Sequence, residues 1–306
     1  MSDLLGHVED YLRLRRALGF KLEREGQILP QFVRYLETAG SATLTSELAI
    51  AWARLPQGVL PITWAHRLGA VRGFARYLQT IDPATEVPPR GVFPTSSPRP
   101  TPYLWSDEDI RRLLQAARTL SSPLRAATHE TLFALIAVTG MRISEALRLG
   151  RDAADLDEGV LWIRDAKFQR PRLIPLHPTT IDALRGYVAC RQRLCPTPAA
   201  TTFFVSTTGT ALRKDGVQRT FIELTTAIGL RTQTRRPRVH DLRHSVAVKS
   251  LIAWHRAGVN VDAAMPLLST YLGHVNPAGT YWYLSAAPEL MELAAARLDT
   301  HFGERR

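Results

Sequence analysis

The chain has 306 residues, enough for about two domains and at least one sizeable core, so a short peptide or a coiled-coil rod is excluded. Hydrophobic residues make up 45% and charged residues 22% of the sequence, which is typical of a globular protein and excludes a chain disordered throughout. The formal net charge is +11, and only four of the 39 cationic residues are lysines. This balance favours a polyanionic partner, because the arginine guanidinium binds phosphate with two parallel hydrogen bonds.

Cysteine content and hydropathy indicate where the protein works. Cys190 and Cys195 are too few for a disulfide framework, and they lack the second ligand pair of a zinc site. No apolar run approaches the roughly 18 residues of a membrane span, and the first residues are acidic where a signal peptide is basic. We therefore expect a cytoplasmic protein that makes no membrane contact.

The first 86 residues have helical periodicity and no strand pattern. Four stretches place apolar residues on one helical face. They are Leu4, Val8, Tyr11 and Leu12; Leu29, Phe32, Val33 and Leu36; Leu48, Ala51, Trp52 and Leu55; and Trp64, Leu68, Val71, Ala75 and Leu78. We predict a compact helical binding domain over residues 1–86, without a catalytic cluster.

A proline-rich segment follows this domain. Seven prolines lie between residues 82 and 102, which disfavours both helices and strand ladders and predicts a linker over residues 87–102. The net charge is +3 before residue 100 and +8 from there on, so most of the basic excess belongs to a second domain at 103–306.

The second domain begins as helix and then changes character. Ser106, followed by three acids, is a helix start, and the apolar run 132–138 predicts a buried helix that ends at Gly140, with a new helix beginning near Arg142. Residues 160–163, 172–176 and 201–206 have the composition of strands, and the pattern is helical from Asp215 to the end. We predict a mainly α fold with a small antiparallel β-sheet.

Two candidate site residues lie in the first half of this domain. Arg142 is followed three residues later by Glu145, which can orient its guanidinium; the alternative is an ordinary surface ion pair. Lys167 lies in the turn between the two predicted strands, where a lysine can donate a proton; the alternative is a solvated turn lysine.

The sequence HDLRH at 240–244 resembles a zinc helix in spacing only. Arg243 would bring a positive charge beside the metal, so we reject that interpretation. Instead His240 and Arg243 lie one turn apart and face an anion, with His244 packed behind. Further arginines concentrate positive charge near these elements and are predicted to bind DNA: Arg170, Arg172, Arg235, Arg236 and Arg238.

A last cluster combines His274 with Tyr283, nine residues later, beside Tyr281 and Trp282. One of the two tyrosines is expected to be an ordinary core residue. The sequence has no phosphate loop, no dinucleotide-binding fingerprint and no carboxylate cage for magnesium, so we expect no cofactor and no metal.

These motifs together resemble the tyrosine recombinase (phage integrase) family. The resemblance covers residues from about 102 to 298 and includes, in the family's order, TGMRISEAL, the hairpin lysine, HDLRH, LGH and a tyrosine nine residues after that His. It implies an α+β catalytic domain and an N-terminal core-binding domain that together clamp double-stranded DNA. The separation of His240 from His274, 34 residues, exceeds that of compact members.

The resemblance also implies roles. Tyr283 would attack a DNA phosphate and form a 3′-phosphotyrosine, Arg142 and Arg243 would hold the non-bridging oxygens, and Lys167 would protonate the leaving oxygen. His240 would assist proton transfer, His274 would donate to the phosphate, and Glu145 would support the site. Neither metal nor ATP would be needed, and four protomers, either all of this chain or together with sister recombinases, would join two duplexes.

The biological role is open at this stage. The run TYWYLSAAPELMELAAARL is similar to recombinases of mobile elements, which favours an integrase or transposase. The alternatives are an Xer-type dimer resolvase, a type IB topoisomerase, and a noncatalytic DNA-binding regulator. The predicted C-terminal helix, with Leu290, Leu293, Ala294 and Leu298 on one stripe, would pack on its own domain or on a neighbouring protomer.

Overall fold

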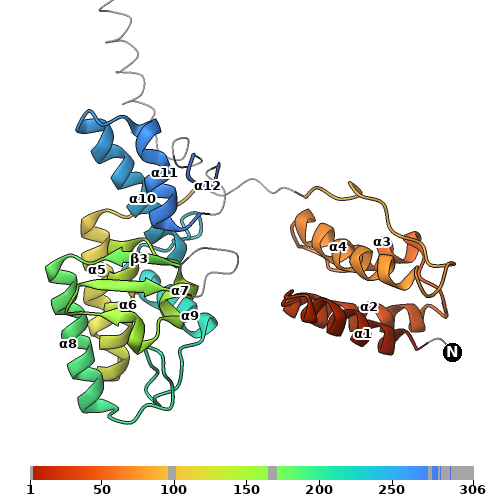
Figure 1. Ribbon diagram of the computed structural model, residues 1–306, viewed down its shortest axis with the longest axis horizontal. Coiled ribbons are helices and arrows are strands. Elements are labelled where there is room, and N and C mark those ends of the chain that lie inside the picture. The colour runs from red at the N-terminus through yellow and green to blue at the C-terminus, as the bar shows by residue number, and fades with distance from the viewer. Residues whose placement is uncertain are drawn as a thin grey trace, which may run out of the picture. The chain divides into compact units, whose positions relative to one another are not determined.

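A computed structural model of the chain describes residues 3–95, 101–164, 171–274, 278–281, 283 and 290. The chain divides into two compact units, Met1–Pro100 and Thr101–Arg306. Figure 1 shows the helices of the first unit and the mixed α and β elements of the second.

Four helices form the first unit: α1 (Leu4–Ala17), α2 (Glu23–Thr38), α3 (Ser46–Arg54) and α4 (Pro61–Leu78). They match the four stretches predicted from periodicity. Phe32 and Trp52 pack edge to face, with ring centroids 5.1 Å apart, and both are almost completely buried. Burial of such aromatic side chains supplies much of the hydrophobic stabilisation of a unit this small.

The segment after α4 packs on these helices before the chain leaves them. Arg72 donates hydrogen bonds to the carbonyl oxygens of Pro88 and Pro89, at 2.8 and 2.7 Å. Phe93 is 6% exposed and packs on Trp64, with ring centroids 5.8 Å apart. The first part of the predicted linker therefore belongs to the hydrophobic core of this unit.

The second unit is built around helices α5 (Asp107–Arg118), α6 (Pro123–Thr139), α8 (Pro178–Leu194) and α9 (Lys214–Ala227). As predicted, the Ser106 hydroxyl caps α5 by accepting from the backbone N–H of Asp109, and α6 ends at Gly140. Gly140 has φ +64°, a left-handed conformation that glycine adopts without strain.

A three-stranded antiparallel sheet completes this core, with strand order β1 (Ala154–Asp155), β2 (Val160–Ile163), β3 (Arg172–Pro175). Leu161 pairs with Ile174, and both side chains are fully buried in the same hydrophobic cluster as Leu132 and Ile136 of α6. Trp162 and Leu173, on the opposite face, stay largely exposed. The predicted mainly α fold with a small antiparallel sheet is confirmed.

Residues 201–206 are not a strand of this sheet, so that prediction was wrong. Phe203, Phe204 and Val205 are buried in succession rather than alternately. Their backbone is bonded by side chains of α8: Arg191 donates to the carbonyl oxygen of Phe203, and the Val205 N–H donates to the Tyr187 hydroxyl. The third strand is instead β1, a two-residue strand too short to show a sequence pattern.

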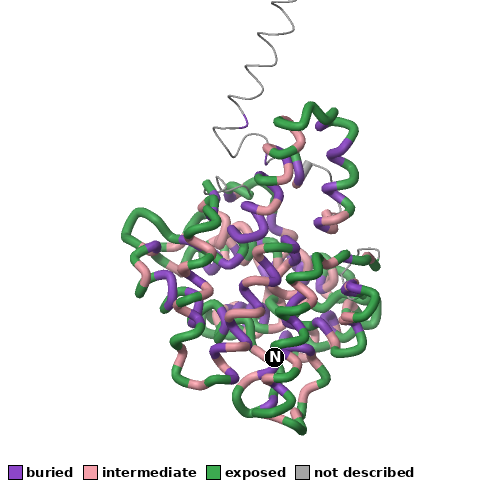
Figure 2. Tube along the Cα trace, turned by 90° about the vertical axis from the view of Figure 1, so that its left-hand side faces the viewer, coloured by how far each residue is buried: buried purple, intermediate pink, exposed green. Residues whose placement is uncertain are grey.

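The remaining described elements are α7 (Ile143–Arg148), a 3₁₀ turn (Arg151–Ala153), α10 (Val239–Arg256), α11 (Val261–Leu272) and α12 (Ala278–Tyr281). Residues 228–238 form a non-helical connection, which breaks the continuous helical pattern expected after residue 215. Helices α10 and α11 form a hairpin that stands out from the rest of the unit in Figures 1 and 2, with exposed residues 256–260 at its tip.

Of the predicted C-terminal helix only Leu290 is described, and it is 2% exposed; residues 291–306 lie outside the described part. Within the described residues, no helix combines the length and apolar character required to cross a membrane.

Candidate active site

Arg142 lies at the start of α7 and is held there by Glu145. The backbone N–H of Arg142 donates to Glu145 Oε2 at 2.8 Å, and its Nη1 donates to Glu145 Oε1 at 2.9 Å. One carboxylate therefore caps the helix N-terminus and orients the guanidinium. Because the Glu145 side chain is 2% exposed and that of Arg142 is 26% exposed, this is not the exposed surface pair of the alternative interpretation.

A second arginine binds the same carboxylate. Arg172, the first residue of β3, donates from Nη1 and Nη2 to the two oxygens of Glu145, at 3.1 and 2.8 Å. Burial alone would raise the pKa of Glu145, but the hydrogen bonds and charges of Arg172 and Arg142 outweigh it and lower that pKa. The carboxylate is therefore ionised and fixed at both oxygens.

Arg243 is the most deeply buried of the arginines around this site, at 1% exposed. Its Nη1 donates to the carbonyl oxygen of Gly140 at 2.8 Å and its Nη2 to that of Leu272 at 2.7 Å. Burial and the charge of Arg142 lower its pKa to about 10, so it stays protonated at neutral pH. Its buried Nε has no hydrogen-bond partner within the described residues. Most buried polar groups in proteins do have one, so this nitrogen is an exception.

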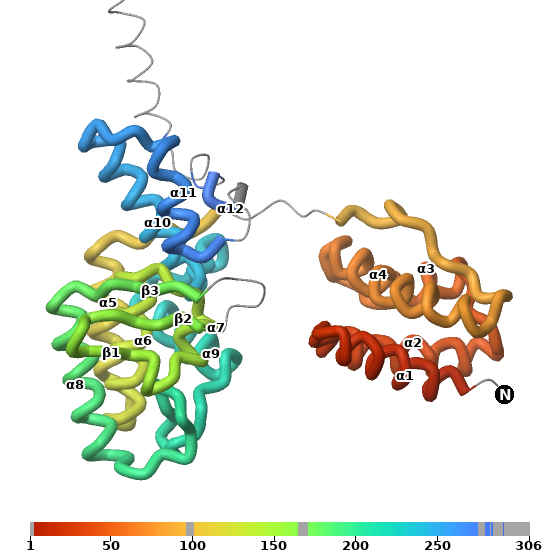
Figure 3. Tube along the Cα trace, in the orientation of Figure 1, coloured from red at the N-terminus to blue at the C-terminus, as the bar shows by residue number. Residues whose placement is uncertain are grey.

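The carbonyls at the end of α11 bring these three arginines together. Arg172 Nε donates to Tyr271 O at 2.9 Å, Arg243 Nη2 donates to Leu272 O, and Arg142 Nη2 donates to Gly273 O at 2.5 Å. The last carbonyls of a helix have no intrahelical partner and lie at the negative end of the helix dipole, so they attract cations. Figure 3 shows β3 beside this end of α11.

Two histidines of α10 extend the cluster. The rings of His240 and His244 are in edge-to-face contact, with centroids 4.5 Å apart. His240 is an exposed residue, but the protein around its ring and the charge of Arg243 lower its pKa to about 4. His244 is buried, and burial together with His240 lowers its pKa to about 3. Both are neutral at pH 7.

Tyr283 lies against this group. It is 2% exposed, with ring centroids 5.3 Å from His244 and 6.0 Å from His274. Tyr281 is 45% exposed. His274 Nδ1 forms a 2.7 Å hydrogen bond with the hydroxyl of the fully buried Thr280, and burial and Arg243 lower its pKa to about 4. Of the two tyrosines, the one predicted from spacing is the one that contacts the histidines.

The other predicted arginines have varied surroundings. Arg235 donates to the carbonyl oxygens of Leu230 and Gly229, at 2.9 and 3.4 Å, and so stabilises the turn after α9. Arg238 precedes α10 and pairs with the buried Asp241 at 2.7 Å. Arg236 is exposed. Lys167 and Arg170 lie outside the described residues.

Arg172 is a half-buried residue with an enclosed side chain. Its side chain is 7% exposed and makes all of its described contacts inside the protein. That Arg172 binds DNA stays a prediction; its described hydrogen bonds are to Glu145 and to the carbonyl oxygen of Tyr271.

The cluster is electrostatically unbalanced. Arg142, Arg172 and Arg243 face a single carboxylate, Glu145, and the pKa values of Arg243, His240 and His274 are all lowered by neighbouring positive charge as well as by burial. In the described part of the chain no group of His, Cys, Asp and Glu is arranged to hold a metal ion. An anion with several oxygens would relieve this repulsion.

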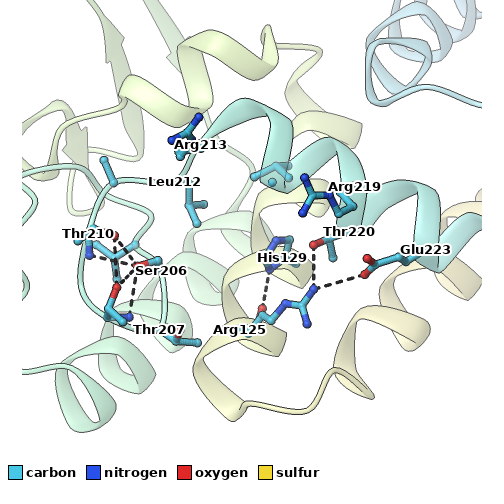
Figure 4. A pocket seen from close by; sticks show the side chains of 15 residues that line it. Arg125, His129, Ser206, Thr207, Thr210, Leu212, Arg213, Arg219, Thr220 and Glu223 are labelled. Carbon is cyan, nitrogen blue, oxygen red and sulfur yellow. Dashed lines mark hydrogen bonds and ion pairs between the residues drawn. The ribbon is translucent and has the colours of Figure 1, made fainter.

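A cavity of about 470 Å³ lies elsewhere, between α6, the loop at 205–213 and the start of α9 (Figure 4). Its polar groups largely pair with one another: Arg125 binds Thr220 and Glu223, and Ser206 binds Thr210. It contains none of the predicted catalytic residues, so size alone does not identify the active site.

Some residues of the cluster had no sequence signal. Four of the acceptors are backbone carbonyls, which every residue has: those of Gly140, Tyr271, Leu272 and Gly273. The Thr280 hydroxyl lies in a short aromatic run, and no motif distinguishes it from other threonines. The glycine that ends each helix, Gly140 and Gly273, was the only local indication.

Comparisons with known proteins show similarity to one family. The model of the phage integrase family matches residues 105–289. The Sinorhizobium fredii protein named "Putative integrase/recombinase y4rB" is 42% identical over the full length of both chains. Tyrosine recombinase XerD of Caulobacter vibrioides is 30% identical, over 89% of this chain and 86% of its own.

Solved structures show the same fold at low identity. The Tn1549 transposon integrase in complex with transposon right-end DNA matches with a TM-score of 0.66 at 16% identity, covering 96% of this chain and 98% of that one. A lambda integrase dimer bound to a core site matches with a TM-score of 0.63 at 18% identity, covering 92% and 76%. With its family match over most of the second unit and relatives along its whole length, the chain belongs to the phage integrase family of tyrosine recombinases.

Proposed function

We propose that this protein is a site-specific recombinase that cuts and rejoins double-stranded DNA through a 3′-phosphotyrosine at Tyr283. The main support is the packing of Tyr283 on His244 and His274, beside the buried Arg243. A nucleophile, neutral histidines and an excess of positive charge in one place suit attack on a phosphodiester.

In the first step the Tyr283 oxygen bonds to phosphorus and the bond to the 5′-oxygen breaks. An ordinary tyrosine has a pKa near 10, so its proton must be accepted by another group. His240 is neutral at pH 7 and would accept it, because a bound phosphate anion would raise the lowered pKa of this histidine towards its usual value. Lys167 would give a proton to the leaving 5′-oxygen.

Arg142 and Arg243 would bind the non-bridging oxygens of the phosphate, and His274 would donate to the same group. Arg243 is held between the carbonyl oxygens of Gly140 and Leu272, which fixes its guanidinium before substrate binds. Donors fixed in advance stabilise developing charge without reorganising during the reaction. When a 5′-hydroxyl of a partner strand attacks the phosphotyrosine, the steps reverse and the tyrosine is released. The phosphotyrosine keeps the energy of the broken bond, so neither ATP nor a metal ion would be required.

The substrate would be two duplexes joined by four protomers, either all of this chain or shared with sister recombinases. The DNA that is integrated or excised would be a mobile element. Two Sinorhizobium fredii integrase/recombinases are 42% and 38% identical to this chain, whereas the XerD of Caulobacter vibrioides is 30% identical. This difference favours integration or excision of an element over resolution of chromosome dimers.

Covalent capture tests the proposal. Wild type, Tyr283→Phe and the matched control Tyr281→Phe would be incubated with fragmented genomic DNA of the source organism, denatured in detergent, and any DNA still attached to protein sequenced. We expect enriched sites with wild type and Tyr281→Phe only. Adducts that persist in Tyr283→Phe would contradict the assignment of the nucleophile.

The captured sequences also separate the roles. Element ends would support the mobile-element role, and a single chromosomal site near the replication terminus would support the Xer-type alternative. Absence of any adduct with the wild type would favour the noncatalytic regulator.

A further inference from the structure

Arg172 is the least exposed partner of the site carboxylate. The three nitrogens of its guanidinium donate to acceptors on two different helices. Nη1 and Nη2 donate to Glu145 of α7, and Nε donates to the carbonyl oxygen of Tyr271 in α11. It therefore joins the helix that begins at Arg142 to the helix that ends beside His274.

The charge and geometry of Glu145 depend on this arginine. Glu145 accepts one guanidinium hydrogen bond from Arg142 and two from Arg172. A bidentate pair fixes the plane of the carboxylate as well as its position. Without Arg172, Glu145 would remain nearly fully buried with Arg142 as its main ion partner, and that carboxylate would hold the Arg142 guanidinium more tightly.

The side chain of Arg172, unlike that of Arg243, is already neutralised by a carboxylate: Arg243 donates to backbone carbonyls in its described hydrogen bonds, whereas Arg172 donates to both oxygens of Glu145 and to Tyr271 O. The side chain of Arg172 is 7% exposed, compared with 26% for the side chain of Arg142. Any effect of Arg172 on a phosphate must therefore pass through Glu145 and Arg142, or through the end of α11.

We propose that Arg172 is a positioning residue: its bridge from Glu145 to Tyr271 O sets the orientation of Arg142 and the location of His274 at the reacting phosphate. This inference rests on the proposed function. It is an alternative to the direct DNA contact predicted for Arg172 from the sequence.

The test compares Arg172→Met, Arg172→Lys and Arg142→Ala with wild type, on a duplex containing a captured site. Arg185→Met is the matched control, because Arg185 also pairs with an acid and a carbonyl, Asp157 and Leu156, but on the exposed side of α8. We expect the rate of adduct formation with Arg172→Met to fall about 10- to 100-fold, since small misplacements of reacting groups have effects of this size. Lysine, which keeps the charge but not the fork, should restore only part of the rate.

DNA affinity and its salt dependence distinguish positioning from direct binding. A positioning residue leaves the dissociation constant within about twofold and the salt slope unchanged, whereas loss of a phosphate contact lowers the slope by about one. A reduced slope in Arg172→Met would overturn the inference.

A neutral substrate distinguishes positioning from a general loss of structure. Replacing one non-bridging oxygen of the cleaved phosphate by methyl removes the charge that Arg142 stabilises. If Arg172 acts through Arg142, the defects of Arg172→Met and Arg142→Ala should both shrink on this methylphosphonate duplex. A defect of the same size on both substrates would indicate disturbed folding and contradict the inference.

The outcomes also separate this inference from the proposed function. Adducts with wild type and an unchanged rate with Arg172→Met would leave the recombinase proposal standing and refute the role of Arg172. If the wild type forms no adduct at all, both are refuted.

Discussion

Arg243 and Leu272 are 29 residues apart in the sequence, and the arginine Nη2 donates a 2.7 Å hydrogen bond to the leucine carbonyl oxygen. The bond connects the N-terminal part of α10, where Arg243 is the fifth residue, to the C-terminal end of α11. Because His274 follows two residues later, the same guanidinium also fixes the end of α11 next to His274. Under the proposed function, one side chain would therefore bind phosphate and position His274.

Arg243→Ala should lower the rate of adduct formation by at least about 100-fold, because it removes a preorganised donor to the phosphate. Arg243→Lys keeps a charge but cannot reach Gly140 and Leu272 together, so it should be nearly as slow. Single-turnover assays on a captured site measure the rate, and circular dichroism checks folding. A near-normal rate in a folded Arg243→Ala protein would refute its assigned role.

Thr280→Val should slow adduct formation about tenfold while leaving DNA affinity within about twofold. The substitution conserves shape but removes the hydroxyl that binds His274 Nδ1 at 2.7 Å, and a hydrogen bond of this kind contributes about 1 kcal/mol. Thr280→Ser retains the hydroxyl and is the matched control. Equal rates for valine and serine would show that the bond does not orient His274.

The helices of the first unit, and α5 and α6 of the second, could be predicted because their signals are local, whereas α8 was not predicted. Apolar periodicity located α1 to α4, and Ser106 and Gly140 marked an N-cap and a C-cap. Strands β2 and β3 were predicted for the same reason. The two-residue β1 could not be, since its pairing with β2 depends on tertiary packing.

The candidate site was only partly predictable. Arg142, Arg243, His274 and Tyr283 were identified by order and spacing, and the structure places them together. The sequence gives no sign that the side chain of Arg172 is enclosed, since arginines are usually at the surface and its partners, Glu145 and a backbone carbonyl, are distant in the chain. His244 was expected behind the site and instead contacts Tyr283 directly.

Acid should destabilise the protein through its buried histidines. The pKa of His244 is lowered to about 3, below the value of about 6.5 in an unfolded chain, so the unfolded state binds more protons between these pH values. The stabilisation from keeping His244 neutral is fully present above pH 6.5 and declines as the pH falls towards 3. Glu145, whose lowered pKa lies below its unfolded value of about 4.5, contributes to acid sensitivity only below that pH.

The melting temperature measured from pH 7 to pH 4.5 tests this. It should fall for wild type and fall less for His244→Phe, which keeps an aromatic ring but does not titrate. The comparison uses the slope with pH, so a constant difference in stability between the two proteins does not affect it. The same slope in both would show that His244 is not protonated on unfolding in this range.

Arg236 and Arg235 should differ in their contribution to DNA binding, although they are adjacent in the sequence. Arg236 is exposed and available to a phosphate, whereas the guanidinium of Arg235 donates to the carbonyl oxygens of Leu230 and Gly229. The affinity of the protein for DNA should fall steeply with salt, because phosphate contacts release counterions. Arg236→Gln should reduce the slope of log K against log salt by about one, whatever the DNA sequence, while Arg235→Gln should leave it nearly unchanged.

Binding titrations over a range of salt concentrations measure both slopes. A larger change for Arg235→Gln than for Arg236→Gln would reverse the assignment, and a flat salt response of the wild type would refute a phosphate clamp altogether.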